Sequence, residues 1–352
     1  MATTYKLTAW NIEWLDKLID GLADPETSAP QRRRLERRLD AIYNVIAEVA
    51  PDILCVTEGP SGEEGIERFV KGMDGYIAVK RPPNDPYLQQ GKQWIWFVVR
   101  EALAPNVSLL PVSIWRQYTE LASPGGEHQA KWPVYRWGEI DASRHGHYRH
   151  PQVLVWDVAG VRVEVIGGHY KSKLTKVGNF KSADPEVRRA YIEETLEARM
   201  KLATEAQNTR YYIDQRFRQD VAPAIFVMGD LNDGPGKELF ERQFLFFDLL
   251  SNLQGDVFES EKFLNHALFD YPEDLRWTVR FKDPIDDTRD PHILLDHIMF
   301  TQALVRNQLP LRVEPHAGQV EHSVFDRANA LLGTNGPVSD HRPVSCLVTV
   351  DQ

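Results

Sequence analysis

The sequence predicts an α/β sandwich, in which helices face two β-sheets. Runs of β-branched and apolar residues bounded by Gly or Asp, such as 225–230, have the length and composition of buried strands. Segments with apolar residues every three or four positions, such as 30–49, predict helices between blocks of strands. Segments 152–157 and 161–166 predict a hairpin that turns at Ala159-Gly160. Blocks of strands with helices between them indicate this fold class.

The first part of the chain predicts two strands that each end in a polar residue. Segment 5–10 alternates polar and apolar residues, as a half-buried strand does, and ends at Asn11. Pro30 begins the amphipathic helix, because proline is well suited to a first helical turn. The apolar run 52–58 then forms a buried strand that ends in the carboxylate of Glu58.

The middle of the chain leads to the strand 225–230. The second arm of the hairpin runs directly into Gly167-Gly-His169. Because side chains alternate along a strand, Asp230 and Asn232 are expected on one face, and Asp233 is expected to be a turn residue. The other elements predicted here are a helix over 63–73, strands over 76–81, 94–100 and 107–110, and one long or two joined helices over 185–221.

The last third predicts a short helix over 236–244 and a strand over 276–281. A central strand over 293–300 contains Asp296 and His297, and His297 is expected to face away from Asp296 and to be structural. Segment 301–337 is expected to be an inserted loop. The chain closes with a strand over 344–350.

Composition favours one large domain over 1–352, with insertions near 172–222, 251–275 and 301–337, because no repeat or linker divides the chain. The sequence predicts a cytoplasmic monomer without stable membrane association. It has no signal-like start and no apolar run long enough to span a membrane, and its two cysteines lie in apolar runs. A net charge of -10 argues against a protein that coats nucleic acid non-specifically.

Polar residues that can handle phosphate or metal follow the ends of separate predicted strands. Each alone is weak evidence, because strand ends often carry capping or turn residues. Their number on different strands makes coincidence improbable. These residues are Asn11, Glu58, His169, Asp230, Asn232, Asp296, Asp340 and His341.

The ordered motifs that contain these residues resemble those of the endonuclease/exonuclease/phosphatase superfamily. The resemblance covers essentially the whole chain and implies the DNase I-like fold, a four-layered α/β sandwich of two packed, mainly antiparallel β-sheets flanked by helices. The motifs are Trp10-Asn11-Ile-Glu13, Thr57-Glu58, Gly168-His169, Gly229-Asp-Leu-Asn232, Leu295-Asp296 and Ser339-Asp-His341.

Phosphodiester hydrolysis needs a cation on the phosphate oxygens and a base for the attacking water. Glu58 and Asp340, with the amide of Asn11, are hard oxygen donors suited to Mg²⁺ or Mn²⁺. The resemblance assigns Asp230 and Asn232 to the attacking water and the phosphate. It assigns His169 and His341 to the phosphate or to proton transfer.

Asp296 can orient one imidazole, and His341 is the favoured partner although His169 stays open. Arg149 resembles the phosphate-binding arginine of DNase I-like enzymes, and Lys171 is a further candidate for substrate binding. Gln93 departs from the family pattern, which has a glutamate in this region. It can hydrogen-bond a histidine but brings no charge.

The leading hypothesis is therefore a Mg²⁺- or Mn²⁺-dependent phosphodiesterase that acts as a nuclease, on DNA rather than RNA. Aromatic residues interleaved with basic ones, which could stack bases or simply pack in a sheet, support a nucleic acid substrate. A phosphoesterase for a phospholipid head group, inositol phosphate or nucleotide is the alternative, and a catalytically silent scaffold is a third. The interleaved residues are Lys131, Trp132, Tyr135, Arg136, Trp137, Arg144 and Tyr148.

Overall fold

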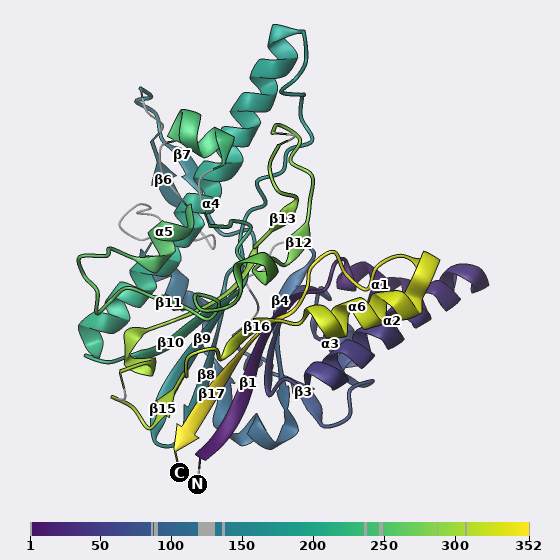
Figure 1. The fold of residues 1–352 in the computed structure, drawn as a ribbon, viewed down its shortest axis with the longest axis vertical. Helices are drawn as coiled ribbons and strands as arrows, with labels where there is room; N and C mark the ends of the chain where they lie inside the picture. Colours follow the sequence, from purple (N-terminus) through teal and green to yellow (C-terminus); the bar gives the residue numbers. More distant parts are fainter. Residues whose placement is uncertain are drawn as a thin grey trace.

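Two mixed β-sheets form the centre of the protein (Figure 1). The structure is a computed structural model that describes residues 2–85, 87, 91–118, 131–135, 138–235, 238–245, 249–286, 288–306 and 308–351. Within these residues, one sheet has seven strands and the other has six. Apolar side chains of both sheets, including Leu7, Phe97, Phe226 and Ile298, form a shared core between them.

The first sheet has the strand order β15-β17-β1-β2-β4-β3, with β16 also paired to β17. Strands β1 and β2 are parallel, and the other neighbours are antiparallel. The strands are β1 (Ala2–Asn11), β2 (Ile53–Gly59), β3 (Tyr76–Ala78), β4 (Trp94–Arg100), β15 (Leu311–Arg312), β16 (Gly318–Val320) and β17 (Val344–Asp351).

The second sheet has the order β11-β14-β10-β9-β8-β5. Here β9 and β10 are the parallel pair, while β8 and β9 form the predicted antiparallel hairpin. Its strands are β5 (Val107–Leu109), β8 (Gln152–Val158), β9 (Val161–His169), β10 (Ala224–Asp230), β11 (Asn265–His266) and β14 (Asp296–Phe300). Two small hairpin sheets consist of β6 (Trp132–Val134) with β7 (Ser143–His145), and β12 (Val279–Arg280) with β13 (His292–Ile293).

Helices cover the outer face of each sheet, which gives the predicted four layers (Figure 1). Helices α1 (Leu15–Ala23), α2 (Ala29–Val49), α3 (Glu63–Val70) and α6 (His322–Leu332) lie over the first sheet. Helices α4 (Pro185–Gln219) and α5 (Leu249–Gln254) lie over the second. Short helical turns are η1 (Glu101–Asn106), η2 (Val112–Tyr118), η4 (Glu241–Leu245), η5 (Glu273–Leu275), η6 (Gln302–Leu304) and η7 (Gly333–Asn335).

Several predicted elements differ from those observed. Segment 301–337 is not a loop, because it contains β15, β16 and α6, and the apolar face of α6 packs beside α2. The strand expected over 276–281 pairs only at 279–280, and the one expected over 293–300 divides into β13 and β14. The helix over 185–219 is continuous. None of the helices in the described ranges is long and apolar enough to cross a membrane.

Candidate active site

The carboxyl ends of the two parallel strand pairs meet at one pocket of about 420 Å³. In the first sheet, Asn11 at the end of β1 lies in register with Thr57, next to Glu58. In the second sheet, Asp230 at the end of β10 lies in register with His169 and Asp296. The sheets are joined here, because Asn11 Nδ2 donates a hydrogen bond to Asp230 Oδ2 at 2.8 Å.

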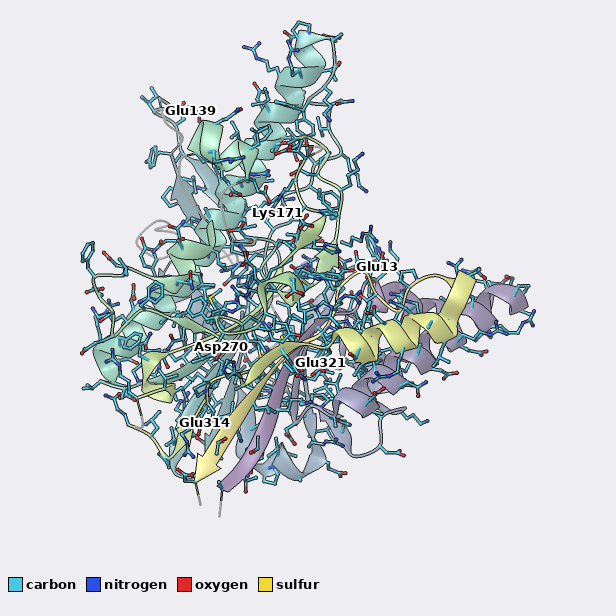
Figure 2. All side chains as sticks on the ribbon, viewed as in Figure 1. Glu13, Glu139, Lys171, Asp270, Glu314 and Glu321 are labelled. Atoms are coloured by element: carbon cyan, nitrogen blue, oxygen red, sulfur yellow. The ribbon has the colours of Figure 1, made fainter. Side chains whose placement is uncertain are left out.

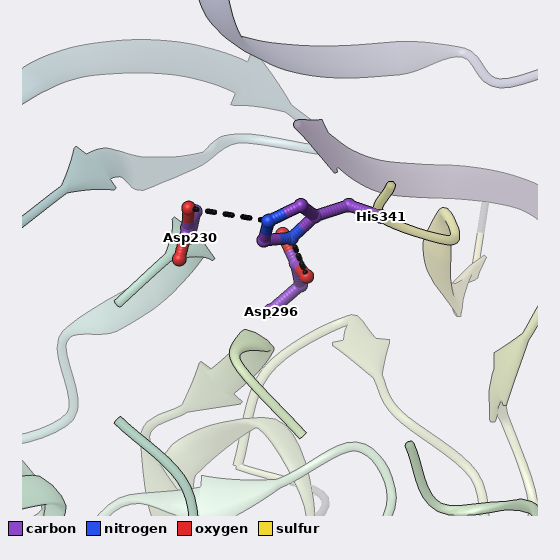
Figure 3. Close-up of side chains that lie close together, drawn as sticks. All are labelled: Asp230, Asp296 and His341. Carbon is purple, nitrogen blue, oxygen red and sulfur yellow. Dashed lines mark hydrogen bonds and ion pairs between the residues drawn. The ribbon is translucent and has the colours of Figure 1, made fainter. Parts of the chain in front are cut away.

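Asp230, Asp296 and His341 form a buried triad in this pocket (Figure 3). His341 Nδ1 lies 2.6 Å from Asp296 Oδ2, and His341 Nε2 lies 3.9 Å from Asp230 Oδ2. His341 is therefore the histidine that Asp296 orients. The backbone carbonyl of His341 accepts from Trp10 Nε1 at 2.9 Å, which fixes the ring against the first sheet.

The two histidines have opposite electrostatic environments. Burial lowers the pKa of the His341 imidazole, but the carboxylates of Asp296 and Asp230 outweigh burial and raise it. Burial lowers the pKa of His169 well below its usual value, and Arg149 and His341 add to this effect. Burial also raises the pKa of Asp230, although His341 opposes the shift. At neutral pH His341 is a cationic donor and His169 is a neutral imidazole.

Asp230 and Asn232 are held by the backbone that follows β10. The amide N–H of Asn232 donates to Asp230 Oδ1 at 2.9 Å, and Asn232 Nδ2 donates to the carbonyl of Tyr170 at 3.0 Å. Gly229 is required because a Cβ there would lie 2.1 Å from the carbonyl oxygen of Gly168 on β9. The Gly-Asp pair therefore lets β9 and β10 approach closely and turns Asp230 into the pocket.

Glu58, Asn11 and Asp340 line the same pocket and offer oxygen ligands. Glu58 Oε2 accepts from the backbone N–H of Trp14 at 2.8 Å and from Gln93 Nε2 at 2.7 Å. Asn11 Oδ1 is buried and has no hydrogen-bond partner among the described residues. A hard divalent cation fits this donor set, because it would satisfy the orphaned amide oxygen and the carboxylates together.

Glu13 also lines this part of the pocket and was missed as a site residue. Burial raises the pKa of Glu13, and the nearby carboxylates of Asp340 and Glu58 raise it further. A bound cation would reduce the repulsion between these carboxylates. The triad is less suited to the ion, because the Asp296 carboxylate already accepts the Nδ1 proton of His341.

Arg149 is linked through Gln93 to Glu58. The Arg149 guanidinium donates to Gln93 Oε1 and to the carbonyl of Lys92, while the Gln93 amide donates to Glu58. The sequence suggested that Gln93 bonds a histidine. In the structure, Gln93 instead joins Glu58 to Arg149. Its backbone is left-handed, with φ 66°.

Lys171 is not among the residues that line the pocket. Its ammonium donates to the carbonyl of Ser172 at 3.1 Å, and its backbone N–H donates to Glu205 Oε2 at 2.7 Å. Figure 2 shows Lys171 beside α4 and Glu13 on the side of α1. The expected substrate contact of Lys171 is therefore not supported, because β9 ends at His169 and the alternation of side chains ends with it.

One face of α4 holds the segments that carry Arg149 and His169. Glu205 is buried and accepts hydrogen bonds from the backbone N–H groups of Lys171 and Tyr148. Burial raises the pKa of Glu205 to about 7, although these two bonds oppose the shift. One turn further along α4, Thr209 Oγ1 accepts from Tyr170 Oη at 2.8 Å.

A network of ion pairs, here called the ion cluster, lies on another side of the pocket. Lys173 contacts Asp233, Glu238 and Glu241, so Asp233 is an ion-pair partner and more than a turn residue. Arg199 and Arg289 also form ion pairs, with Glu238 and Asp283 as their partners. The ion cluster consists of Lys173, Arg199, Arg289, Asp233, Glu238, Glu241 and Asp283.

Two further residues at the pocket were not found from the sequence. Arg280 of β12 is exposed and lines the pocket, and its guanidinium has no hydrogen-bond or ion-pair partner in the described part of the chain. Its neighbour Val279 bridges to His341, which places Arg280 close to the triad. Trp14 is 42% exposed at the pocket, next to Glu58.

The aromatic residues proposed to stack bases divide into different environments. Tyr135 and Tyr148 are exposed, whereas Trp132 is half-buried and packs edge-on against His147. Arg136 and Trp137 lie outside the described residues. His297 is structural in the expected way, since its ring bonds His266 at 2.9 Å and the carbonyl of Asp233 at 2.7 Å.

A family model described as the Endonuclease/Exonuclease/phosphatase family matches residues 8–341. A search of curated proteins finds no match. Among solved structures, truncated TDP2 of Caenorhabditis elegans is 13% identical with a TM-score of 0.50, and the similarity covers 99% of this chain and 98% of that one. At this identity the similarity shows the fold alone.

Lower TM-scores are found for two further structures. A mannosyl-6-phosphatase of Bacteroides thetaiotaomicron VPI-5482 is 13% identical with a TM-score of 0.48, covering 98% of this chain and 99% of that one. D. rerio TDP2 complexed with a single strand DNA product is 10% identical with a TM-score of 0.46, covering 98% and 99%. These similarities do not identify the substrate class of this chain.

Proposed function

Because the chain belongs to the Endonuclease/Exonuclease/phosphatase family, we propose that it is a divalent-metal-dependent phosphodiester hydrolase that acts on DNA. One observation carries the proposal. The bond from Asn11 to Asp230 brings the oxygen donors of the first sheet and the triad of the second sheet to one pocket. Such a pocket can hold a phosphate between a cation and proton-transfer groups.

Asn11, Glu58 and Asp340 would hold Mg²⁺ or Mn²⁺, with Glu13 close by. When bound, the ion neutralises charge on the phosphate oxygens and at the leaving oxygen. The protein's own residues supply the rest. Asp230, fixed by Asn11 and by the Asn232 amide, is placed to accept a proton from the attacking water.

His341 and His169 complete the proposed chemistry. Asp296 holds the His341 ring so that Nε2 lies on the side of Asp230, where it can donate to a phosphate oxygen. His169 Nε2 lies 3.6 Å from Asp230 Oδ2, which places it beside the same phosphate. Arg149 and Arg280 at the pocket supply cationic contacts for phosphate.

DNA is the proposed substrate because Arg149 and Arg280 bring two cations to this pocket, and the exposed ring of Tyr148 lies against Arg149. A small phosphoester, such as that of a phospholipid head group, inositol or nucleotide, is the second candidate. It is favoured by the pocket volume of about 420 Å³, which is in the range of small-ligand sites. The intact contacts of the triad do not favour a silent scaffold.

The test is cleavage of plasmid, linear and single-stranded DNA with Mg²⁺ or Mn²⁺, and with EDTA. Wild type is expected to cut at least one of them only when the metal is present. His341→Ala is expected to lose the activity and keep the fold, as measured by circular dichroism. Absence of metal-dependent cleavage of every DNA, with hydrolysis of a small phosphoester, would favour the second candidate.

The proposal also includes a cytoplasmic, monomeric enzyme formed by one domain. Cys55 and Cys346 are buried free thiols, which is usual in a reducing compartment. The oligomeric state is checked by light scattering of the purified protein at several concentrations.

A further inference from the structure

The residues that line the pocket fall into two groups by their contacts. The first group contains the triad, the proposed metal ligands and Arg149, which contact one another directly or through Gln93. The second group, here called the outer wall, is built from the segments after β9 and β10, from α4 and from the region of β12 and β13. The wall joins the first group at β12, where Val279 bridges to His341.

Apart from Arg280, the cations of the outer wall belong to the ion cluster and are already paired with its carboxylates. Arg199 pairs with Glu238 at 2.6 Å, and Arg289 pairs with the same carboxylate at 3.0 Å. Lys173 is 8% exposed and lies among acidic side chains. With three cations and four carboxylates, the cluster offers no unpaired positive charge to a phosphate chain.

The same wall presents apolar and aromatic surface to the pocket. Phe240 and Tyr191 are buried, and Phe180 packs against both with ring centroids 5.6 and 6.2 Å away, so the three rings form one packed cluster. Phe281 and Leu174 are 36% and 57% exposed beside them. A packed aromatic cluster with exposed apolar side chains at the same pocket suits an uncharged ring.

Arg280 marks the boundary between the two groups. It is an unpaired cation among the described lining residues, and it follows Val279, which bridges to His341. A phosphate beside the triad can therefore reach Arg280, whereas a second phosphate further along the wall would meet paired charges and apolar side chains. The pocket therefore favours a single phosphate attached to an uncharged group over a chain of successive phosphates.

We propose that the outer wall is a subsite for the base of a terminal nucleoside, so that the enzyme hydrolyses the phosphodiester at the end of a DNA strand. This inference rests on the proposed function and names its substrate class more closely. The base packs against Phe281 and Leu174, and the attached phosphate lies at the triad. Hydrolysis at internal positions of a long DNA strand is disfavoured, because the next phosphate would have to lie along the outer wall.

The first test compares two small diesters with the same leaving group, both with Mg²⁺ present. They are the p-nitrophenyl ester of thymidine 5′-monophosphate and methyl p-nitrophenyl phosphate. The value of kcat/KM is expected to be about tenfold or more higher for the nucleoside ester, as base–aromatic contacts are of this size. The double variant Phe281→Ala/Leu174→Ser is expected to lower this ratio.

Phe258→Ala is the matched control, because Phe258 is 94% exposed and does not line the pocket. It is expected to leave the ratio of wild type unchanged. A direct binding measurement accompanies the kinetics, in which calorimetry compares thymidine 5′-monophosphate with inorganic phosphate. The nucleotide is expected to bind about tenfold more tightly, and the double variant to lose that advantage.

The outcomes separate the two proposals. Hydrolysis of both esters at equal kcat/KM, or a preference that the double variant retains, would overturn the subsite while leaving the phosphodiesterase intact. Hydrolysis of neither ester and of no DNA would overturn the proposed function and this inference together. A labelled linear duplex provides the last check, since release of single nucleotides from the ends supports the subsite and cleavage at internal positions alone refutes it.

Discussion

The hydrogen bond between Asp296 and His341 can be removed with little change in shape. We expect Asp296→Asn to lower kcat by about 10²- to 10⁴-fold, because the His341 imidazolium then loses the carboxylate that orients its ring and keeps it protonated. The measurement is steady-state hydrolysis of p-nitrophenyl thymidine 5′-monophosphate. Asp290→Asn is the control, since Asp290 is an exposed partner of His292, and it should keep the rate of wild type.

Arg280 offers a test of substrate binding. We expect Arg280→Ala to raise KM about tenfold with a smaller effect on kcat, because a charge-assisted contact to phosphate is lost. Arg280→Lys should recover part of the loss. Arg189→Ala changes the same residue type on the exposed side of α4 and should leave KM as it is. An unchanged KM for Arg280→Ala would remove Arg280 from the site.

Single residues at strand ends are the part of the candidate site whose position follows most directly from the sequence. Asp230, Asp296 and His341 follow apolar runs, and alternation along a strand gives their direction. Arg280 was missed because only the fold shows that it faces the pocket without a partner. Lys171 does not line the pocket, because β9 and its alternation of side chains end at His169.

At the scale of elements, α4 couples stability to pH through Glu205. Its folded pKa of about 7 lies above the usual 4.5, so its stabilising contribution is complete below pH 4.5 and is lost as pH rises through 7. The loss is on the order of 3 kcal/mol. We expect Glu205→Gln to lack this loss, so that its stability relative to wild type increases between pH 5 and pH 8.

The measurement for Glu205 is urea unfolding of both proteins at the two pH values. Groups other than Glu205 titrate in both proteins and cancel in the difference. A constant difference between pH 5 and pH 8 would show that the carboxyl group does not titrate in this range.

The ion cluster connects α4 to the segments after β9 and β10. We expect Lys173→Met to lower the free energy of unfolding by about 3–5 kcal/mol, because the buried carboxylates of Asp233 and Glu241 would both lose their ion pair with the Lys173 ammonium. Lys262→Met removes an exposed ion pair with Glu259 and should change stability by less than about 0.5 kcal/mol. Chemical denaturation of both variants decides the comparison.

Elements with a clear period were predicted from the sequence, and short ones were not. The hairpin of β8 and β9 and the helix α2 have long, regular patterns. Helix α6 was taken for a loop although Phe325, Ala328 and Leu332 share a face. Its 11 residues follow the short strands β15 and β16, and so short a pattern becomes evident only through packing on α2.

At the scale of the whole molecule, the proposed metal site lies where the two sheets meet. We expect Mg²⁺ to raise the midpoint of thermal unfolding, because an ion that binds only the folded protein stabilises it by about 2.7 kcal/mol at 100 times Kd. EDTA should abolish hydrolysis and remove this increase while the protein stays folded. Glu58→Gln should show a smaller increase, measured by scanning calorimetry.

The sandwich and its four layers were predicted, but the strand order was not. A hydrophobic pattern in the sequence identifies a strand but does not show which other strand pairs with it. The parallel pairing of β1 with β2 and of β9 with β10 depends on contacts far apart in the sequence. These pairs are what bring the polar strand ends together at one pocket.

The left-handed backbone of Glu58 has a consequence for laboratory evolution. Its φ of 58° costs a side-chain-bearing residue about 1–3 kcal/mol, which glycine would avoid. Burial of its carboxyl group adds a second cost, seen in its raised pKa. Selection of random mutants for heat resistance alone would therefore favour variants that lose this residue, and with it the proposed metal ligand. A screen for robust enzymes from this scaffold needs to score turnover and heat resistance together.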